Sequence, residues 1–367
     1  PEADTIVAVF SSDEITGYDV GSQLRQQLKD MYERRLPAES KYITNKYKEY
    51  TLDYVRFLEK PMAEAAYPDK ETRLLALARY WNTINFFYPH KQTIGKNWER
   101  VLQQYIPVFA AASNELAYHQ AILRLNKELA DSHTFVNSPV INSMWGPNPH
   151  FMVGYIEDKF VITKLQSDSL AQAEDIKVGD VIESINGKPV KQRVKELWPL
   201  MKGSNEIATY RDIANYLLNV DGNDFATIEI LRNGNRLTRK ISRYPYQQLV
   251  KLSDKPNQDK LWWEVERGIM YVDYTKIRKP DALNRLFKEL QNASSVILDL
   301  RGYPSFQVYQ QTLPALFAKN FHVSNSSNAL VSYPGFFSVS KNMFERTDTS
   351  SLLPYSGGVI VLVNETT

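Results

Sequence analysis

The sequence contains no cysteine among its 367 residues. Disulfide bonds, thiolate metal sites and a cysteine nucleophile are therefore excluded. The absence does not fix the compartment, because exported proteins need not carry disulfides.

Other chemical signals are also missing. The longest apolar run, near residues 359–363, has the length of a strand, whereas a bilayer-spanning helix needs about 20 residues. The 44 basic and 42 acidic residues give a net charge of only +2, so no nucleic-acid partner is predicted. The five histidines form no H-x-x-x-H or H-x-H pair, and no glycine-rich phosphate motif occurs. We therefore expect neither a metal nor a cofactor.

The length is sufficient for two or three domains, and the composition, 43% apolar and 23% charged, is that of a globular protein. The chain begins with Pro1, and no leader-like segment follows it. We expect a piece of a longer protein at both ends.

The amino-terminal half is predicted to be helical. Residues 1–70 suggest a strand at 5–10 and a polar helix at 21–35 but no function. Within the predicted segment 71–142, Leu77, Trp81 and Ile84 recur at helical spacing up to Pro89. A second helix is predicted over residues 113–129, with Ser113 as its N-cap.

The pattern changes to short strands and turns over residues 150–245. Residues 160–165 have strand character, and Asn186-Gly187 and Asn233-Gly234 are tight-turn signals. The second turn joins two alternating segments, which predicts a hairpin. This part is predicted to be a small β-rich domain with an exit linker at 251–260.

Residues 260–367 predict an α/β core. A strand at 268–277, a helix opening at Pro280 and the strand VILDL form a strand–helix–strand unit with parallel strands. A helix at 307–319 and a long polar loop then lead to GGVIVLV. Polar residues follow both buried strands, and the carboxyl ends of such strands are where ligands and chemistry collect.

Five segments, in this order, resemble the serine peptidases of the C-terminal processing and tricorn type. They are DSHT at 131–134, IKVGDVIESINGKPV at 176–190, IMYV at 269–272, DLRGYP at 299–304 and VLVNET at 361–366. The second resembles a PDZ domain. The resemblance implies a multidomain α/β fold with a helical amino-terminal part, an inserted β-rich PDZ-like domain and an incomplete crotonase/ClpP-like peptidase core.

The resemblance also implies roles for individual residues. In tricorn-type members, His133 would correspond to the general base and Ser132 to an orienting hydroxyl, since serine needs an adjacent base at neutral pH. The loop from Gly302 through Tyr303 and Ser305 to Phe306 would supply backbone oxyanion donors. The family has a glycine pair at Ser305-Phe306, which puts the oxyanion hole in doubt.

The nucleophilic serine of the family, and the lysine base of its C-terminal processing branch, would follow Thr367. The chain alone is therefore expected to be inactive. Peptide or unfolded-protein substrates are expected, with the PDZ groove as a docking site or only a scaffold. Export to the periplasm or cell surface is the implied location. A non-catalytic peptide-binding protein and a lipophilic-ligand carrier on the same fold remain alternatives.

Overall fold

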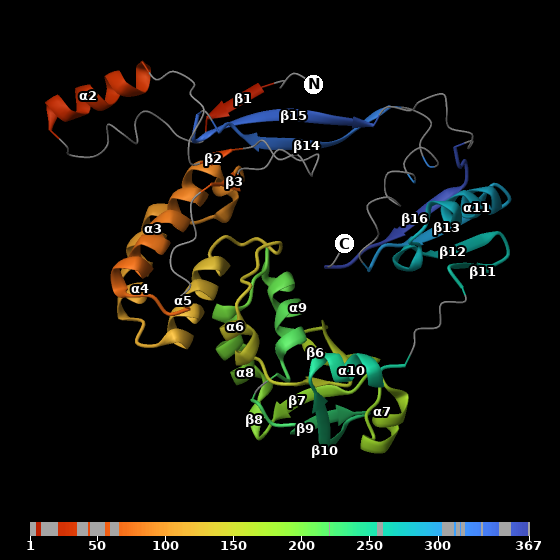
Figure 1. Ribbon diagram of the computed structural model, residues 1–367. Coiled ribbons are helices and arrows are strands. Elements are labelled where there is room, and N and C mark those ends of the chain that lie inside the picture. Colours follow the sequence, from red (N-terminus) through yellow and green to blue (C-terminus); the bar gives the residue numbers. More distant parts are fainter. Residues whose placement is uncertain are drawn as a thin grey trace. The chain divides into compact units, whose positions relative to one another are not determined.

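The computed structural model describes residues 5–8, 21–34, 43–44, 56–58, 66–219, 221–254, 260–302, 312, 316, 320–331, 333–344 and 354–365. The chain forms two compact units, Pro1–Ala121 with Phe321–Phe344 and Ile122–Asn320 with Glu345–Thr367. Figure 1 labels their helices and strands.

The first unit contains the first predicted helix of segment 71–142 and, up to Ala121, the beginning of the second. Helix α3 (Lys70–Phe87) starts at Asp69, whose side chain accepts a bond from Thr72 N at 2.7 Å. It packs against α4 (Trp98–Ala111), and the indole N–H groups of Trp81 and Trp98 each bond the other residue's carbonyl. Helix α4 was not predicted, because Pro107 lies inside it and proline normally ends a helical pattern.

Helix α5 (Glu115–Lys127) confirms the second predicted helix but corrects its cap. Asn114, not Ser113, accepts the bond from Ala117 N, at 2.9 Å. An amide oxygen serves the same capping purpose as a hydroxyl. The remaining elements here are α2 (Ser22–Glu33), η1 (Lys91–Ile94), β2 (Ile43–Thr44) and β3 (Arg56–Phe57).

The first unit also holds a three-stranded antiparallel sheet. Its strands are β1 (Thr5–Ala8), β15 (Phe336–Phe344) and β14 (Phe321–Ala329), in that order. The predicted polar loop after residue 319 is therefore wrong over these two hairpin strands. Its serine and asparagine side chains bond one another across the hairpin, as Asn342 does with Ser324 and Ser326, so polar residues serve as strand formers.

In the second unit, residues 148–252 form the predicted small β-rich domain. The sheet order is β4-β10-β9-β7-β6-β5, with β8 against β7. The predicted hairpin is confirmed, since Asn233 and Gly234 both have positive φ between β9 and β10. Helices α7 to α10 complete the domain around an aliphatic core.

The strands of this domain are β4 (Asn148–Pro149), β5 (Phe151–Ile156), β6 (Lys159–Leu165), β7 (Val181–Ile185), β8 (Lys188–Pro189), β9 (Phe225–Arg232) and β10 (Asn235–Tyr244). The helices are α6 (Pro139–Met144), which precedes the domain, α7 (Asp168–Glu174), α8 (Val190–Leu197), η2 (Trp198–Leu200), α9 (Glu206–Tyr216) and α10 (Tyr246–Leu252).

The α/β part of the second unit is a four-stranded sheet in the order β11-β12-β13-β16. The strand–helix–strand prediction is confirmed: β12 and β13 are parallel, and α11 lies between them in sequence. Leu283, Leu286 and Phe287 of α11 are buried in the core of this part. Its elements are β11 (Trp262–Glu266), β12 (Ile269–Asp273), η3 (Tyr274–Lys276), α11 (Pro280–Leu290), β13 (Ser295–Asp299) and β16 (Gly358–Leu362).

Two predictions fall largely outside the described residues. The helix predicted at 307–319 is described only at Thr312 and Leu316, and the exit linker only at its two ends. The described strands of the α/β part form one mixed sheet, with one antiparallel and two parallel pairings. The crotonase/ClpP-like topology of the whole core stays a prediction.

Candidate active site and peptide-binding groove

The two motifs predicted to flank the active site lie on neighbouring strands. Strands β13 and β16 are parallel, with Asp299 beside Leu362 in register, and Leu300 N donates to the carbonyl of Leu362 at 2.9 Å. Strand β12 adds Asp273 beside Asp299 on the other side. The loops after DLRG and VLVN therefore leave the sheet from the same edge.

Asp299 anchors the start of the loop after β13. Its carboxylate accepts bonds from the backbone N of Arg301 at 3.0 Å and from the guanidinium at 3.0 and 2.8 Å. The Tyr271 hydroxyl donates to the same carboxylate. The bonds from Arg301 lower the pKa of Asp299 to about 2, against the opposing effect of burial. The Asp299–Arg301 pairing expected from the sequence is thus present, and Tyr271 joins it.

Gly302 is the only predicted oxyanion-loop residue that the described chain includes. A Cβ there would lie 2.3 Å from Cγ2 of Thr275, so the backbone passes directly over that side chain. Thr275 is itself held by Asp273, to which its hydroxyl donates at 2.5 Å. Tyr303, Ser305 and Phe306 lie outside the described residues, and their role stays a prediction.

The DSHT segment forms a turn organised by Asp131. Its carboxylate accepts from His133 N at 2.8 Å, and its carbonyl accepts from the Thr134 hydroxyl at 2.8 Å. The carboxylate also lies 3.4 Å from Nδ1 of His133. The His133 side chain is 88% exposed, so a ligand could reach the ring. Sequence reasoning missed Asp131, although the D-x-H spacing is a signal for such a turn.

Ser132, the predicted orienting hydroxyl, faces a different partner. Its Oγ accepts from Ser204 N at 3.0 Å and donates to Ser204 Oγ at 3.2 Å. A second link lies nearby, where Nζ of Lys127 donates to the Met201 carbonyl at 2.9 Å and sits over the Trp198 ring. The turn is therefore tied to the segment between α8 and α9. The role of Ser132 in orienting a catalytic group stays a prediction.

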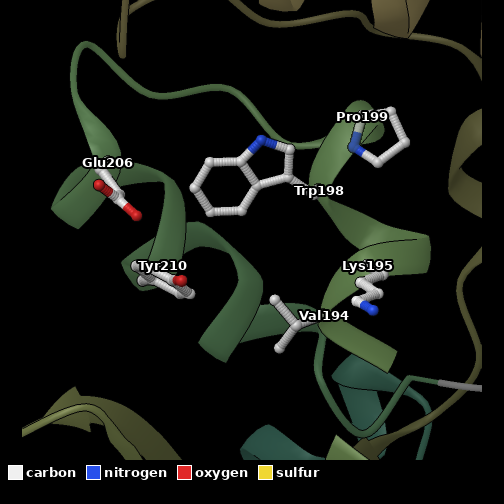
Figure 2. Close-up of a pocket in the computed structure, with 6 residues that line it drawn as sticks. All are labelled: Val194, Lys195, Trp198, Pro199, Glu206 and Tyr210. Carbon is white, nitrogen blue, oxygen red and sulfur yellow. The ribbon is translucent and has the colours of Figure 1, made fainter. Parts of the chain in front are cut away.

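Two hollows lie on the small β-rich domain. One, of about 400 Å³, lies between α8–η2 and α9, where Figure 2 shows Trp198 directed into the space between the two helices. The other, of about 160 Å³, lies where β5 begins and α9 ends, beside α10. The lining of the second consists of Asn148, Pro149, Phe151, Met152, Val153, Gln166, Ala214, Asn215, Leu218, Asn219, Tyr246 and Leu249.

Among the residues that the structure describes, no group of three or more His, Asp or Glu side chains is arranged to hold a metal ion. Among the same residues, no helix is both long and apolar enough to cross a bilayer. Strand β5 pairs with β6 alone among the described strands, which leaves its other edge open beside α9.

Comparison with known proteins identifies the small domain and the fold. The family model for the PDZ domain matches residues 150–247. Mature CPAF shares 14% identity and a TM-score of 0.56, over 81% of this chain and 79% of that chain. A CPAF mutant gives 13% identity, a TM-score of 0.58 and the same coverage. No curated protein matches the sequence.

A third solved structure, the photosystem II D1 C-terminal processing protease, shares 14% identity over 80% of this chain and 74% of that chain, with a TM-score of 0.41. The predicted PDZ domain is thus confirmed, and the chain has the fold of CPAF over about four fifths of its length. The resemblance to PDZ-containing proteases of the C-terminal processing kind, drawn from the motifs, agrees with the PDZ match and with the fold shared with CPAF.

Proposed function

We propose that this chain belongs to a serine endopeptidase of the C-terminal processing or tricorn type, with a crotonase/ClpP-like core. The observation that carries the proposal is the register of β13 and β16. It brings the carboxyl ends of the strands that carry DLRG and VLVN side by side, in a chain with a PDZ domain and the fold of CPAF. Ligands and catalytic groups gather at such edges.

The proposed chemistry is acyl transfer. A serine following the VLVNET segment attacks the scissile carbonyl and gives its proton to the imidazole of His133. The carbonyl oxygen becomes an oxyanion, which accepts bonds from backbone N–H groups of the loop at Gly302–Phe306. Protonated His133 then donates to the leaving amine, and water releases the acyl group by the same steps.

Asp131 supports His133 in this proposal. Its carboxylate lies 3.4 Å from Nδ1, on the side of the ring opposite Nε2. A carboxylate at Nδ1 favours the tautomer whose Nε2 can accept a proton and stabilises the imidazolium that forms. Ser132 would then keep the turn in place through Ser204, in addition to the orienting role implied by the resemblance.

The PDZ domain is proposed to dock the substrate, a peptide or an unfolded polypeptide. The open edge of β5 offers backbone groups to an extended chain, which is how PDZ domains add a strand. The cavity at the start of β5 is lined without a charged side chain, which favours an uncharged, apolar substrate group. Export to the periplasm or cell surface is part of the proposal by resemblance alone.

A non-catalytic peptide-binding protein is the second candidate. The observation that favours it is Ser305-Phe306 in place of the family's glycine pair, because a required φ above zero disfavours any other residue. Such a protein would keep the docking groove and lose hydrolysis. The lipophilic-ligand carrier has no comparable support in the described hollows.

The test is an assay of the full-length protein with a fluorogenic peptide that ends in an apolar residue. His133→Ala is expected to lower kcat by about 10²–10⁴-fold, the usual contribution of a general base. His90→Ala, which removes another exposed imidazole, is the matched control and should leave kcat unchanged. A fluorophosphonate probe should label the wild-type protein at a serine.

The outcomes separate the candidates. Labelling and hydrolysis that survive His133→Ala would exclude His133 as the base and favour the lysine-dependent branch. Peptide binding without labelling or hydrolysis would refute the peptidase and favour the non-catalytic protein.

A further inference from the structure

Helix α9 of the small domain is bonded to the segment that leads toward the proposed nucleophile. Nη1 of Arg211 donates to the backbone carbonyl of Glu365 at 2.5 Å. Glu365 follows the end of β16 and lies within the VLVNET segment, and both residues belong to the second compact unit. The VLVNET segment is therefore held by an element outside its own sheet.

The carboxylate of Asp212 fixes the direction of the Arg211 side chain. Its Oδ1 accepts bonds from Nη2 of Arg211 at 3.1 Å and from Nε at 3.4 Å. These two nitrogens form one edge of the planar guanidinium, so Nη1 is directed away from Asp212. Because the donor is charged, its bond to the Glu365 carbonyl is stronger than one between neutral groups.

The helix that carries Arg211 is fixed in the core of the small domain. It starts at Asn205, whose side chain accepts a bond from a backbone N–H of the first turn at 2.8 Å. Ile213 is fully buried in the aliphatic core. Tyr210 stacks on Tyr155 of β5, with the ring centroids 4.0 Å apart and the planes 10° apart. An anchor on α9 therefore has the rigidity of the domain behind it.

The start of the same helix holds the turn that contains His133. Ser204 directly precedes the N-cap Asn205, and it bonds Ser132 through its backbone N at 3.0 Å and its Oγ at 3.2 Å. A helix rises about 1.5 Å per residue, so the path from Asn205 to Arg211 is about 9 Å long. Both turns of the proposed site are thus tied to one rigid element, about 9 Å apart along its axis.

We infer, on the basis of the peptidase function above, that Arg211 is a positioning residue for the nucleophile. Arg211 holds the backbone at Glu365 while Ser204 holds the turn with His133, so α9 sets the distance between the attacking serine and the base. A base must lie within hydrogen-bond reach of the proton that it takes. A misplacement of about 1 Å can lower the rate about 10²-fold.

The experiment compares two variants of Arg211 in the full-length protein, with the fluorogenic peptide described above. Arg211→Met keeps a long unbranched side chain but removes every donor. Its kcat should fall at least tenfold while KM changes less than twofold, because substrate docking does not use this bond. Arg211→Lys retains a charged donor on a side chain of similar length, and should bring kcat to within threefold of the wild-type value.

Arg236→Met is the matched control. This arginine of β10 also bonds a carboxylate of the small domain, that of Glu183 at 2.8 Å, and it should leave kcat and KM unchanged. Hydrogen exchange on residues 359–365 supplies a readout that needs no activity. Exchange there should become at least fivefold faster in Arg211→Met and should not change in Arg236→Met.

The failures of the inference and of the peptidase function are distinguishable. Unchanged exchange at residues 359–365 in Arg211→Met, or a rise in KM with kcat unchanged, overturns the positioning role and leaves the peptidase standing. A loss of kcat that Arg236→Met reproduces, or that Arg211→Lys does not restore, also overturns it. Absence of hydrolysis and of fluorophosphonate labelling in the wild-type protein overturns the peptidase and this inference with it.

Discussion

Asp299→Asn is expected to lower the local stability of the carboxyl end of β13, where the proposed oxyanion loop begins. The Asp299 side chain is 10% exposed, and its carboxylate accepts bonds from Arg301 and Tyr271. Its pKa falls from 3.8 to about 2 in the folded chain. Each unit of pKa corresponds to 1.36 kcal/mol, so the ionised carboxylate contributes about 2 kcal/mol at pH 7. Arg301 is half exposed and can be solvated by water, which keeps the cost below that of a fully buried broken pair.

The effect should depend on pH with a definite sign. Because the folded pKa of Asp299 is depressed, its contribution is complete above about pH 4 and fades as the pH falls through about 2. About half of it should remain near pH 3. Wild type and Asp299→Asn should therefore converge in acid, since the wild-type carboxyl is then also neutral.

Hydrogen exchange read by mass spectrometry on residues 295–302 isolates this edge from the rest of the chain. The free energy of opening at pH 7 should fall by about 2 kcal/mol in Asp299→Asn. Asp281→Asn, at an exposed position in the first turn of α11, is the control and should change it by less than about 1 kcal/mol. An equal effect of the two variants, or a difference that persists undiminished at pH 2, would refute the reasoning.

Two further variants test a neighbouring glycine and a carboxylate of the PDZ domain. Gly302→Ala should cost about 1–3 kcal/mol, because the new methyl group overlaps Thr275, and adding Thr275→Ser should restore part of the exchange protection at residues 295–302. No rescue by Thr275→Ser would exclude the overlap as the cause. Glu174→Gln should destabilise the PDZ domain by about 1–3 kcal/mol in urea denaturation. Burial raises the pKa of Glu174, but the bonds from His150 and Ser242 N outweigh burial, so that the pKa is lowered overall. The loss should shrink as the pH falls below the ordinary glutamate range, and a loss that grows in acid would contradict this assignment.

The fold was predictable where local pattern decides structure. Apolar runs that stop in polar residues identified β13 and β16, and Asn-Gly turns identified the hairpin of β9 and β10. Parallel pairing of β12 and β13 followed from the intervening helix. Local rules failed at α4, where Pro107 lies inside the helix, and at β14 and β15, whose polar side chains have the composition of a loop.

The site was only partly predictable, because much of it depends on contacts between distant residues. Nothing in DSHT indicates that Ser132 bonds Ser204, 72 residues later. The Tyr155–Tyr210 stack joins a strand to a helix 55 positions further on, and neither tyrosine carries a motif. The resemblance of short segments to a peptidase family indicated which loops belong to the site. The hydrogen-bond and packing partners of each side chain could be identified only from the folded structure.

The bonds from Ser132 and Lys127 into the segment 198–204 have a practical consequence for engineering. That segment lies inside the region matched by the PDZ family model, whereas Ser132 and Lys127 both lie upstream of it. A chimera that replaced residues 150–247 with a foreign module would cut these two links, even if every strand of the module folded correctly. A replacement module that retained Trp198, Met201 and Ser204 would keep the contacts with Lys127 and Ser132, and so would still hold the turn that contains His133.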